Sequence, residues 1–198
     1  MNTSPLFGKN ILLGITGSIA AYKTPELTRQ LVKLGANVKI IATKDACNFV
    51  TPLTLSTVSK NPVLSSLISD NNTWNNHVDL AGWADIFLIA PATANIIAKM
   101  ACGICDSILL ATFLSSSCKV FCAPAMDRDM YLNIVTKENI NTLGNFDSNY
   151  PKTTTLKYYL GKRGRKVSVL IKNSETRKKI SKEHNLLGQS KLSDMKSY

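Results

Sequence analysis

Four uninterrupted apolar runs, each closed by small residues or a proline, constrain this chain most: "NILLGI" (10–15), "NVKIIAT" (37–43), "DIFLIAP" (85–91) and "KVFCAP" (119–124). Strands that are buried on both faces read as continuous apolar runs, because helices cover both sides of their sheet. Short turns and helical spacing of apolar residues separate the runs. The sequence therefore predicts an α/β fold with a doubly wound, flavodoxin-like or Rossmann-like parallel sheet in three layers.

The spacing of apolar residues and caps predicts helices over about 18–34, 93–102, 106–116 and 128–143. Residues 65–76 are polar and rich in Asn and Ser, which indicates an exposed loop. The apolar periodicity fades after Leu143. We therefore expect one domain over residues 1–145 and a basic, Ser-rich tail over residues 146–198.

The net charge of +11 is concentrated in the tail, since residues 150–198 hold 13 Lys+Arg against 3 Asp+Glu. The only clustered basic run, "KRGRK", is short, so nucleic-acid binding is not expected. The longest apolar run falls short of the roughly 20 residues that a membrane span needs. Five cysteines without a secretory leader favour a cytoplasmic protein, and "CGIC" (102–105), which lacks a second metal-binding pair, is expected to be buried.

Unusual residues follow each apolar run, at strand ends that should converge on one crevice. "GITGSIAAYK" lacks the spacing of a dinucleotide fingerprint, so Gly17 and Ser18 suit a single phosphate, although an ordinary turn with an N-cap serine explains them equally well. In "APATAN", small residues would let a ring approach the backbone, while capping by Thr93 is the plainer alternative. Asp127 and Asp129 are adequately explained as first-turn acids.

His77 is one of only two histidines, and it precedes a predicted strand. Taken alone it would be a solvated loop or capping residue. At the mouth of a strand-end crevice it becomes a candidate acid, base or anion-binding group.

Together, "GITGSIAAYK", "NHVDLAGWAD", "APATANIIAKMACGICDSILLATFLSS" and "APAMDRDMY" resemble the homo-oligomeric flavin-containing cysteine decarboxylases, most closely those acting on phosphopantothenoylcysteine. The resemblance covers roughly residues 6–145. It implies FMN across the strand ends, no metal, and His77 and Asp127 as the catalytic residues. It further implies contacts from Gly17, Ser18 and Thr43 to the phosphate and ribityl side, from Thr93, Ala94 and Asn95 to the flavin, and from Ala125, Met126 and Asp127 to substrate.

The chemistry implied by this resemblance is decarboxylation of 4′-phosphopantothenoyl-L-cysteine to 4′-phosphopantetheine in coenzyme A biosynthesis. FMN would oxidise the substrate thiol to a thioaldehyde, CO2 would leave, and reduced FMN would return two electrons. The family forms trimers or multiples of trimers with sites between subunits, so a homotrimer is expected.

Three departures from the family pattern stand out. Asp127 replaces the asparagine of a Pro-Ala-Met-Asn motif, where an ionised carboxylate would repel the substrate carboxylate and a protonated one could donate to it. Ile96 replaces a threonine. Residues 144–198 contain no cysteine, whereas the family has a clamp cysteine that protonates the ene-thiolate, and the ligase domain that usually follows is absent. We interpret residues 146–198 as a truncated or frame-shifted, non-homologous tail.

Two alternatives follow from these departures. A flavin prenyltransferase shares the fold and the FMN site, but the histidine motif and the Pro-Ala-Met turn argue against it. A non-catalytic FMN-binding or regulatory subunit would explain the lost clamp cysteine, whereas the retained His77 argues against it.

Overall fold

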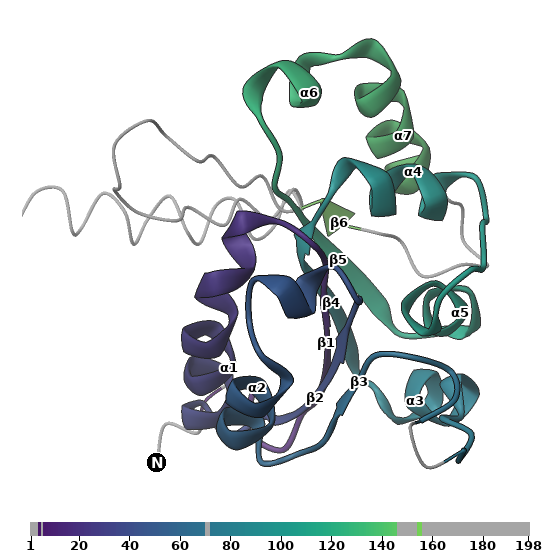
Figure 1. Ribbon diagram of the computed structural model, residues 1–198. Coiled ribbons are helices and arrows are strands. Elements are labelled where there is room, and N and C mark those ends of the chain that lie inside the picture. Colours follow the sequence, from purple (N-terminus) through teal and green to yellow (C-terminus); the bar gives the residue numbers. More distant parts are fainter. Residues whose placement is uncertain (1–3, 5, 70–71, 146–153, 156–198) are drawn as a thin grey trace, which may run out of the picture.

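A computed structural model describes residues 4, 6–69, 72–145 and 154–155 of the chain. They form a six-stranded, entirely parallel sheet in the order β3-β2-β1-β4-β5-β6 (Figure 1). The strands are β1 (Asn10–Ile15), β2 (Asn37–Ala42), β3 (Val63–Leu64), β4 (Ile86–Ala92), β5 (Lys119–Pro124) and β6 (Thr154–Thr155). The predicted fold class is confirmed, and all four predicted strands are present within a residue of their expected ends.

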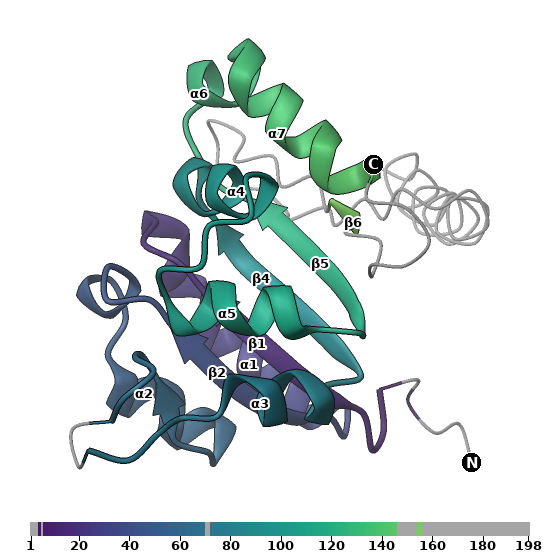
Figure 2. The ribbon, with the colours of Figure 1, turned by 90° about the vertical axis from the view of Figure 1, so that its right-hand side faces the viewer.

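Helices cover both faces of the sheet, which makes the three layers visible in Figures 1 and 2. One face carries η1 (Ile19–Lys23), α1 (Thr24–Lys33), η2 (Ala46–Asn48) and α2 (Pro52–Ser59). The other carries α3 (His77–Trp83), α4 (Ala94–Ala101) and α5 (Ile108–Ser115), with α6 (Arg128–Leu132) and α7 (Ile134–Asn145) continuing beyond β5. None of these helices is long and apolar enough to cross a membrane.

Two apolar cores fix the layers, one on each face of the sheet. Leu13 and Ile40 belong to the core beneath α1 and α2. Leu12 and Phe87 belong to the core beneath α4 and α5. All four side chains are completely buried, and full burial of such a side chain stabilises a fold by about 1.5–3 kcal/mol. Successive residues of β1 therefore supply both cores, which is why its sequence is continuously apolar.

The chain reverses its direction of travel across the sheet between β1 and β4. From β1 it moves outward through β2 to β3, and it then returns to place β4 on the other side of β1. Ile11 consequently lies opposite Val38 of β2 and Ile86 of β4. Ligands of open parallel sheets bind outside the carboxyl ends of the strands at such a point. We call the end of the sheet at which these strands finish the carboxyl edge, and the end at which they begin the amino edge.

Some helix boundaries differ from the prediction. The helix predicted over 18–34 divides into η1 and α1, because Pro25 near the start of α1 has no N–H to continue the hydrogen bonding of the preceding turn. The helix predicted over 128–143 divides at Asn133, whose extended backbone and side chain, accepting from the N–H of Val135 at 2.9 Å, begin a new helix. Helices α2 and α3 were not predicted. The tail, apart from β6, lies outside the described residues.

Candidate functional site

Hydrogen bonds between neighbouring loops join four strand ends at the carboxyl edge. The N–H of Thr43, after β2, donates to the carbonyl oxygen of Ile15 at 2.9 Å. The N–H of Ala125, after β5, donates to the carbonyl oxygen of Ala92 at 2.9 Å. Between these pairs, the hydroxyl of Thr16 connects the ends of β1 and β4. The loops joined in this way therefore form one continuous surface, and they carry all the predicted site residues except His77 and Asp127. Asp127 follows directly on the same chain segment as Met126.

Gly17 and Ser18 follow β1, and the structure explains both residue types locally. A Cβ at Gly17 would lie 2.4 Å from Cβ of Asp45, so close packing of the β2 loop requires glycine there. Ser18 caps η1 by accepting from the N–H of Ala20 at 3.3 Å, and its own N–H donates to the carbonyl oxygen of Thr16 at 2.9 Å. Among the described residues the N–H of Gly17 has no protein acceptor, so it is the amide of this pair that is available to an anion.

Thr93, Ala94 and Asn95 begin α4 directly after β4. The Thr93 hydroxyl accepts from the N–H of Ile96 at 3.3 Å, which confirms the capping role. In the described part of the chain, no protein acceptor is present for the N–H groups of Ala94 and Asn95. These two amides point along the positive end of an eight-residue helix, where they favour an anionic or electron-rich partner.

Ala125, Met126 and Asp127 lead from β5 into α6. Ala125 is buried, Met126 packs partly against the core beneath α4, and Asp127 is exposed. The Asp127 carboxylate makes no capping hydrogen bond to α6, although its backbone precedes the first turn. This carboxylate is therefore free to meet a ligand.

A small hollow opens beside the carboxyl ends of β4 and β5, on the face covered by η1 and α1. Its walls are small or apolar apart from one cation, and they consist of Ala20, Lys23, Thr24, Leu27, Ala90, Pro91, Ala123 and Ala125. We call it the β4–β5 hollow. Lys23 is the single charged residue among these wall residues, and its Nζ lies 5.6 Å from the centroid of the Tyr22 ring.

His77 is the first residue of α3 and does not lie on a strand-end loop. Asn76 caps this helix by accepting from the N–H groups of Val78 and Asp79 at 3.0 and 3.4 Å. The His77 ring meets Trp74 edge-on with centroids 6.1 Å apart, and its Nδ1 is buried without a hydrogen-bond partner. No hydrogen bond or ion pair among the described residues joins His77 to the carboxyl-edge candidates.

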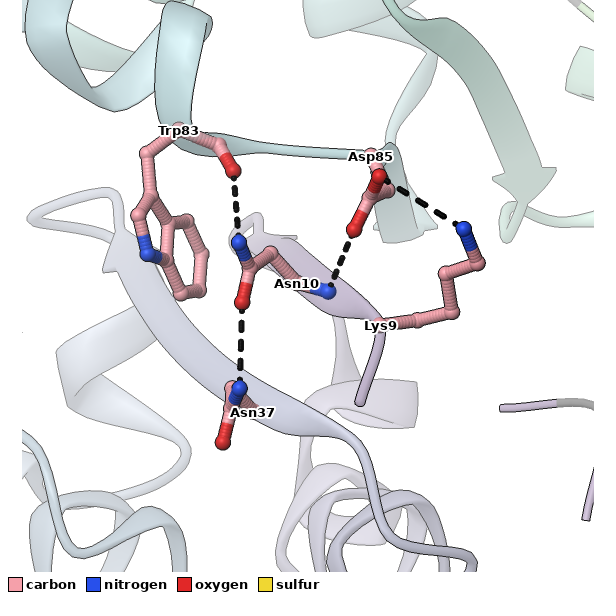
Figure 3. A network of polar contacts seen from close by, with 5 residues as sticks. All are labelled: Lys9, Asn10, Asn37, Trp83 and Asp85. Carbon is pink, nitrogen blue, oxygen red and sulfur yellow. Dashed lines mark hydrogen bonds and ion pairs between the residues drawn. The ribbon is translucent and has the colours of Figure 1, made fainter. Parts of the chain in front are cut away.

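The Trp-Ala-Asp end of the histidine motif lies at the amino edge, far from the strand-end loops along β4. Asn10 donates its backbone N–H to Asp85 Oδ2 at 2.8 Å and its side-chain amide to the carbonyl oxygen of Trp83 at 3.1 Å (Figure 3). Asn37 donates to Asn10 Oδ1 at 3.1 Å, and Lys9 pairs with Asp85 at 3.7 Å. These contacts join the first residues of β1, β2 and β4, so this part of the motif has a structural role.

The prediction that Cys102 and Cys105 are buried is wrong, because both side chains are exposed. Gly103, with φ +70°, ends α4 in a turn closed by hydrogen bonds from Gly103 N–H to Met100 O and from Ile104 N–H to Lys99 O. This αL turn directs the following loop to solvent. Within the described ranges, no group of three His, Cys, Asp or Glu residues could hold a metal ion.

The carboxyl edge suits a flavin. Unpartnered amides of Gly17, Ala94 and Asn95 can receive an anion or ring heteroatoms, and the small side chains of Ala94 and Ala125 leave the backbone accessible to a flat ring. Thr43 is half-buried, and its hydroxyl accepts from the N–H of Ala46 at 3.2 Å. The unpartnered donors thus come from the ends of two adjacent strands, β1 and β4.

Sequence reasoning missed two residues of this edge. Thr16 was read only as part of a turn, although a threonine between a buried strand and Gly17 has a hydroxyl that burial obliges to find partners. Lys23 was quoted only as a motif letter, and its position five residues after Ser18, at the end of the turn that Ser18 caps, was the available signal.

Comparisons with known proteins agree with this geometry. The family model described as Flavoprotein matches residues 2–157. The chain is 50% identical over 139 residues to the coenzyme A biosynthesis bifunctional protein CoaBC of Vibrio cholerae, which covers 70% of this chain but only 35% of that protein. It is 45% identical over 141 residues to a probable phosphopantothenoylcysteine decarboxylase of Streptococcus mutans, covering 70% of this chain and 79% of the relative.

Among solved structures, the FMN-dependent cysteine decarboxylase SpaF is similar with a TM-score of 0.70 and 27% identity, over 83% of this chain and 90% of that one. The chain thus spans about a third of the bifunctional relatives, and most of the single-function one.

Proposed function

The chain belongs to the Flavoprotein family, and from this we propose that it is an FMN-dependent decarboxylase that converts 4′-phosphopantothenoyl-L-cysteine to 4′-phosphopantetheine. The observation that carries the proposal is the carboxyl edge. There, unpartnered amides and small residues from adjacent strand ends surround the point at which the chain reverses its direction across the sheet. The similarity to a probable phosphopantothenoylcysteine decarboxylase over most of its length supports the choice of substrate.

FMN is the flavin that we propose for this edge. Gly17, Ser18 and Thr43 would hold its phosphate and ribityl side, and Thr93, Ala94 and Asn95 its ring. Bound FMN supplies a reversible two-electron oxidation of the substrate thiol, which gives the departing carboxylate an electron sink. The chain contributes backbone donors fixed by the loop hydrogen bonds, so binding requires little rearrangement.

Two charged residues of the site, Lys23 and Asp127, would act in opposite directions on a substrate that carries two anionic groups. Lys23 in the β4–β5 hollow offers an ammonium group to an anion. The carboxylate of Asp127 faces solvent beside Met126 and opposes a substrate carboxylate placed there. His77 would present Nε2, because its Nδ1 is buried and makes no hydrogen bond. From that nitrogen it can donate to or accept a proton from substrate.

We further propose a homotrimer, or a multiple of it, in the cytoplasm. Within one chain, no described contact brings His77 to the carboxyl edge. A neighbouring subunit that supplies the missing part of each site would solve this. A monomeric mass by light scattering at micromolar protein would contradict the proposal.

The deciding experiment is anaerobic incubation of the purified chain, loaded with FMN, with 4′-phosphopantothenoyl-L-cysteine, followed by mass analysis. Loss of CO2 alone is expected of a complete decarboxylase. Loss of CO2 together with two hydrogens would show that oxidation and decarboxylation proceed while the final reduction fails. An unchanged substrate in the presence of bound FMN would overturn the proposed activity in favour of a flavin-binding role.

A further inference from the structure

Thr16 lies at the end of β1, at the point where the chain reverses its direction of travel across the sheet. It follows the last residue of β1, next to the end of β4, and only 2% of its surface is exposed. A hydroxyl buried to this degree is costly unless it is hydrogen-bonded. Its partners therefore show what it contributes.

The Thr16 hydroxyl makes two hydrogen bonds to the loop that follows β4. Oγ1 donates to the carbonyl oxygen of Pro91 at 2.6 Å and accepts from the N–H of Thr93 at 3.1 Å. It thus holds the backbone on both sides of Ala92. The flanking links at this edge, from Thr43 to Ile15 and from Ala125 to Ala92, are bonds between backbone groups. Among the described residues, Thr16 is the one whose side chain joins the ends of β1 and β4, in addition to the backbone hydrogen bonds of the sheet itself.

This bridge sets the orientation of the first turn of α4. Thr93 is the N-cap of that helix, and the two following amides, of Ala94 and Asn95, are those without a protein acceptor. The helical backbone that follows the Thr93 cap fixes the next two N–H groups relative to Thr93, so the bond from Thr16 to the N–H of Thr93 also sets where those amides lie against the end of β1. Without the Thr16 hydroxyl, the carbonyl oxygen of Pro91 would lose its donor and the N–H of Thr93 would lose its acceptor.

We propose that Thr16 is a positioning residue for the flavin crevice, whose hydroxyl holds the amides of Ala94 and Asn95 in the geometry that receives the cofactor. The role rests on the proposed flavin site. It predicts that removing the hydroxyl weakens flavin binding while the chain still folds, because α4 and β4 remain anchored in a buried core.

The test compares three single variants with the wild-type chain. Thr16→Val removes the hydroxyl and keeps the branched shape, whereas Thr16→Ser keeps the hydroxyl. Thr28→Val is the matched control, since Thr28 is completely buried on α1 and its hydroxyl has no partner. Each protein is freed of flavin and titrated with FMN by flavin fluorescence, and the Tm of each flavin-free form is measured alongside.

The expected result is a Kd for FMN raised at least tenfold in Thr16→Val, and within about threefold of wild type in Thr16→Ser and Thr28→Val, because only Thr16→Val removes the hydroxyl that holds the N–H of Thr93. Wild-type affinity in Thr16→Val would overturn the role of Thr16 alone. A wild-type chain that takes up no FMN would overturn the flavin assignment and this role together.

A second measurement covers the case in which Thr16→Val does not fold. In the flavin-free wild-type chain, hydrogen exchange should be slow at the N–H of Thr93 and fast at those of Ala94 and Asn95, and FMN should slow the latter two. Fast exchange at Thr93, or amides of Ala94 and Asn95 that FMN leaves unchanged, would contradict the proposal.

Discussion

Asp85 accepts a hydrogen bond from the backbone N–H of Asn10 at 2.8 Å, and this contact joins the start of β4 to the start of β1 at the amino edge. Asp85→Ala should lower the free energy of unfolding by about 1 kcal/mol, since it leaves the N–H of Asn10 without its partner. Lys9→Ala should cost less, about 0–1 kcal/mol, because the pair spans 3.7 Å between half-exposed groups. Denaturant unfolding of both variants checks this. An affinity for FMN that falls in Asp85→Ala would contradict a purely structural role.

Gly17→Ala tests the packing requirement at this residue. The added Cβ would lie 2.4 Å from Cβ and 3.2 Å from the carbonyl carbon of Asp45, so the β2 loop must move. We expect a loss of about 1–3 kcal/mol in the free energy of unfolding. Gly82→Ala is the control, since a Cβ there meets nothing within 4 Å and replaces glycine inside α3. It should stabilise by about 0.5–1 kcal/mol. Equal effects of the two changes would refute the packing argument.

His77→Asn should reduce turnover of 4′-phosphopantothenoyl-L-cysteine by a factor of about 10²–10⁴, the usual contribution of a positioned acid or base. The FMN content should stay at the wild-type value, because His77 makes no described hydrogen bond to the carboxyl edge. Trp74→Leu, which removes the edge-on ring contact alone, should have the smaller effect. Turnover that His77→Asn leaves unchanged would end the claim for a catalytic histidine.

Asp127→Asn should lower KM for the substrate while changing kcat less. Two unit charges about 4 Å apart in water repel by about 1 kcal/mol, which corresponds to roughly a fivefold change in affinity. The substitution preserves the backbone at the start of α6, because the carboxylate makes no capping bond there. Asp129→Asn, two residues further on in the first turn of the same helix, is the control and should leave KM unchanged. A higher KM in Asp127→Asn would show that the carboxylate aids binding.

Burial of Cys122 in β5 makes stability depend on alkaline pH. Desolvation raises the pKa of its thiol to about 12 from an ordinary value of 9.0. Above pH 9 the unfolded chain therefore loses this proton while the folded chain keeps it, so stability falls as the pH rises through the window from about 9 to about 12. The slope from one proton is about 1.4 kcal/mol per pH unit. Unfolding of wild type and Cys122→Ala at pH 8 and pH 10 should show the smaller loss in the variant.

The strands β1, β2, β4 and β5 were predictable from sequence because most of their residues are buried against helices on both faces of the sheet. Leu12 and Leu13 of β1 belong to opposite cores, and so no polar residue interrupts the run. Helices α2 and α3 were missed for opposite reasons. The eight residues of α2 include three Ser or Thr hydroxyls that bond their own backbone, as Thr57 does to the carbonyl oxygen of Leu53. The seven residues of α3 contain Gly82 and are too few to show a helical period.

Sequence reasoning placed the carboxyl-edge residues because the end of a parallel strand is readable from where its apolar run stops. Thr16 was not recognised, because a hydroxyl that joins two distant chain segments leaves no mark in local spacing: its partners Pro91 and Thr93 lie 75 and 77 positions away. The exposure of Cys102 was missed for a similar reason. It depends on the backbone of Gly103, whose φ of +70° no composition rule specifies.

The sheet keeps its side-chain anchors at the edge opposite the proposed site. Side chains of Asn10, Asn37 and Asp85 fasten the amino edge, whereas the carboxyl edge is fastened by the backbone and by Thr16. A lineage built on this plan can exchange exposed residues such as Asp127 and so reach new substrates without disturbing the contacts that align its strands. Substrate preference can therefore diverge while the fold is retained, because different residues determine the two.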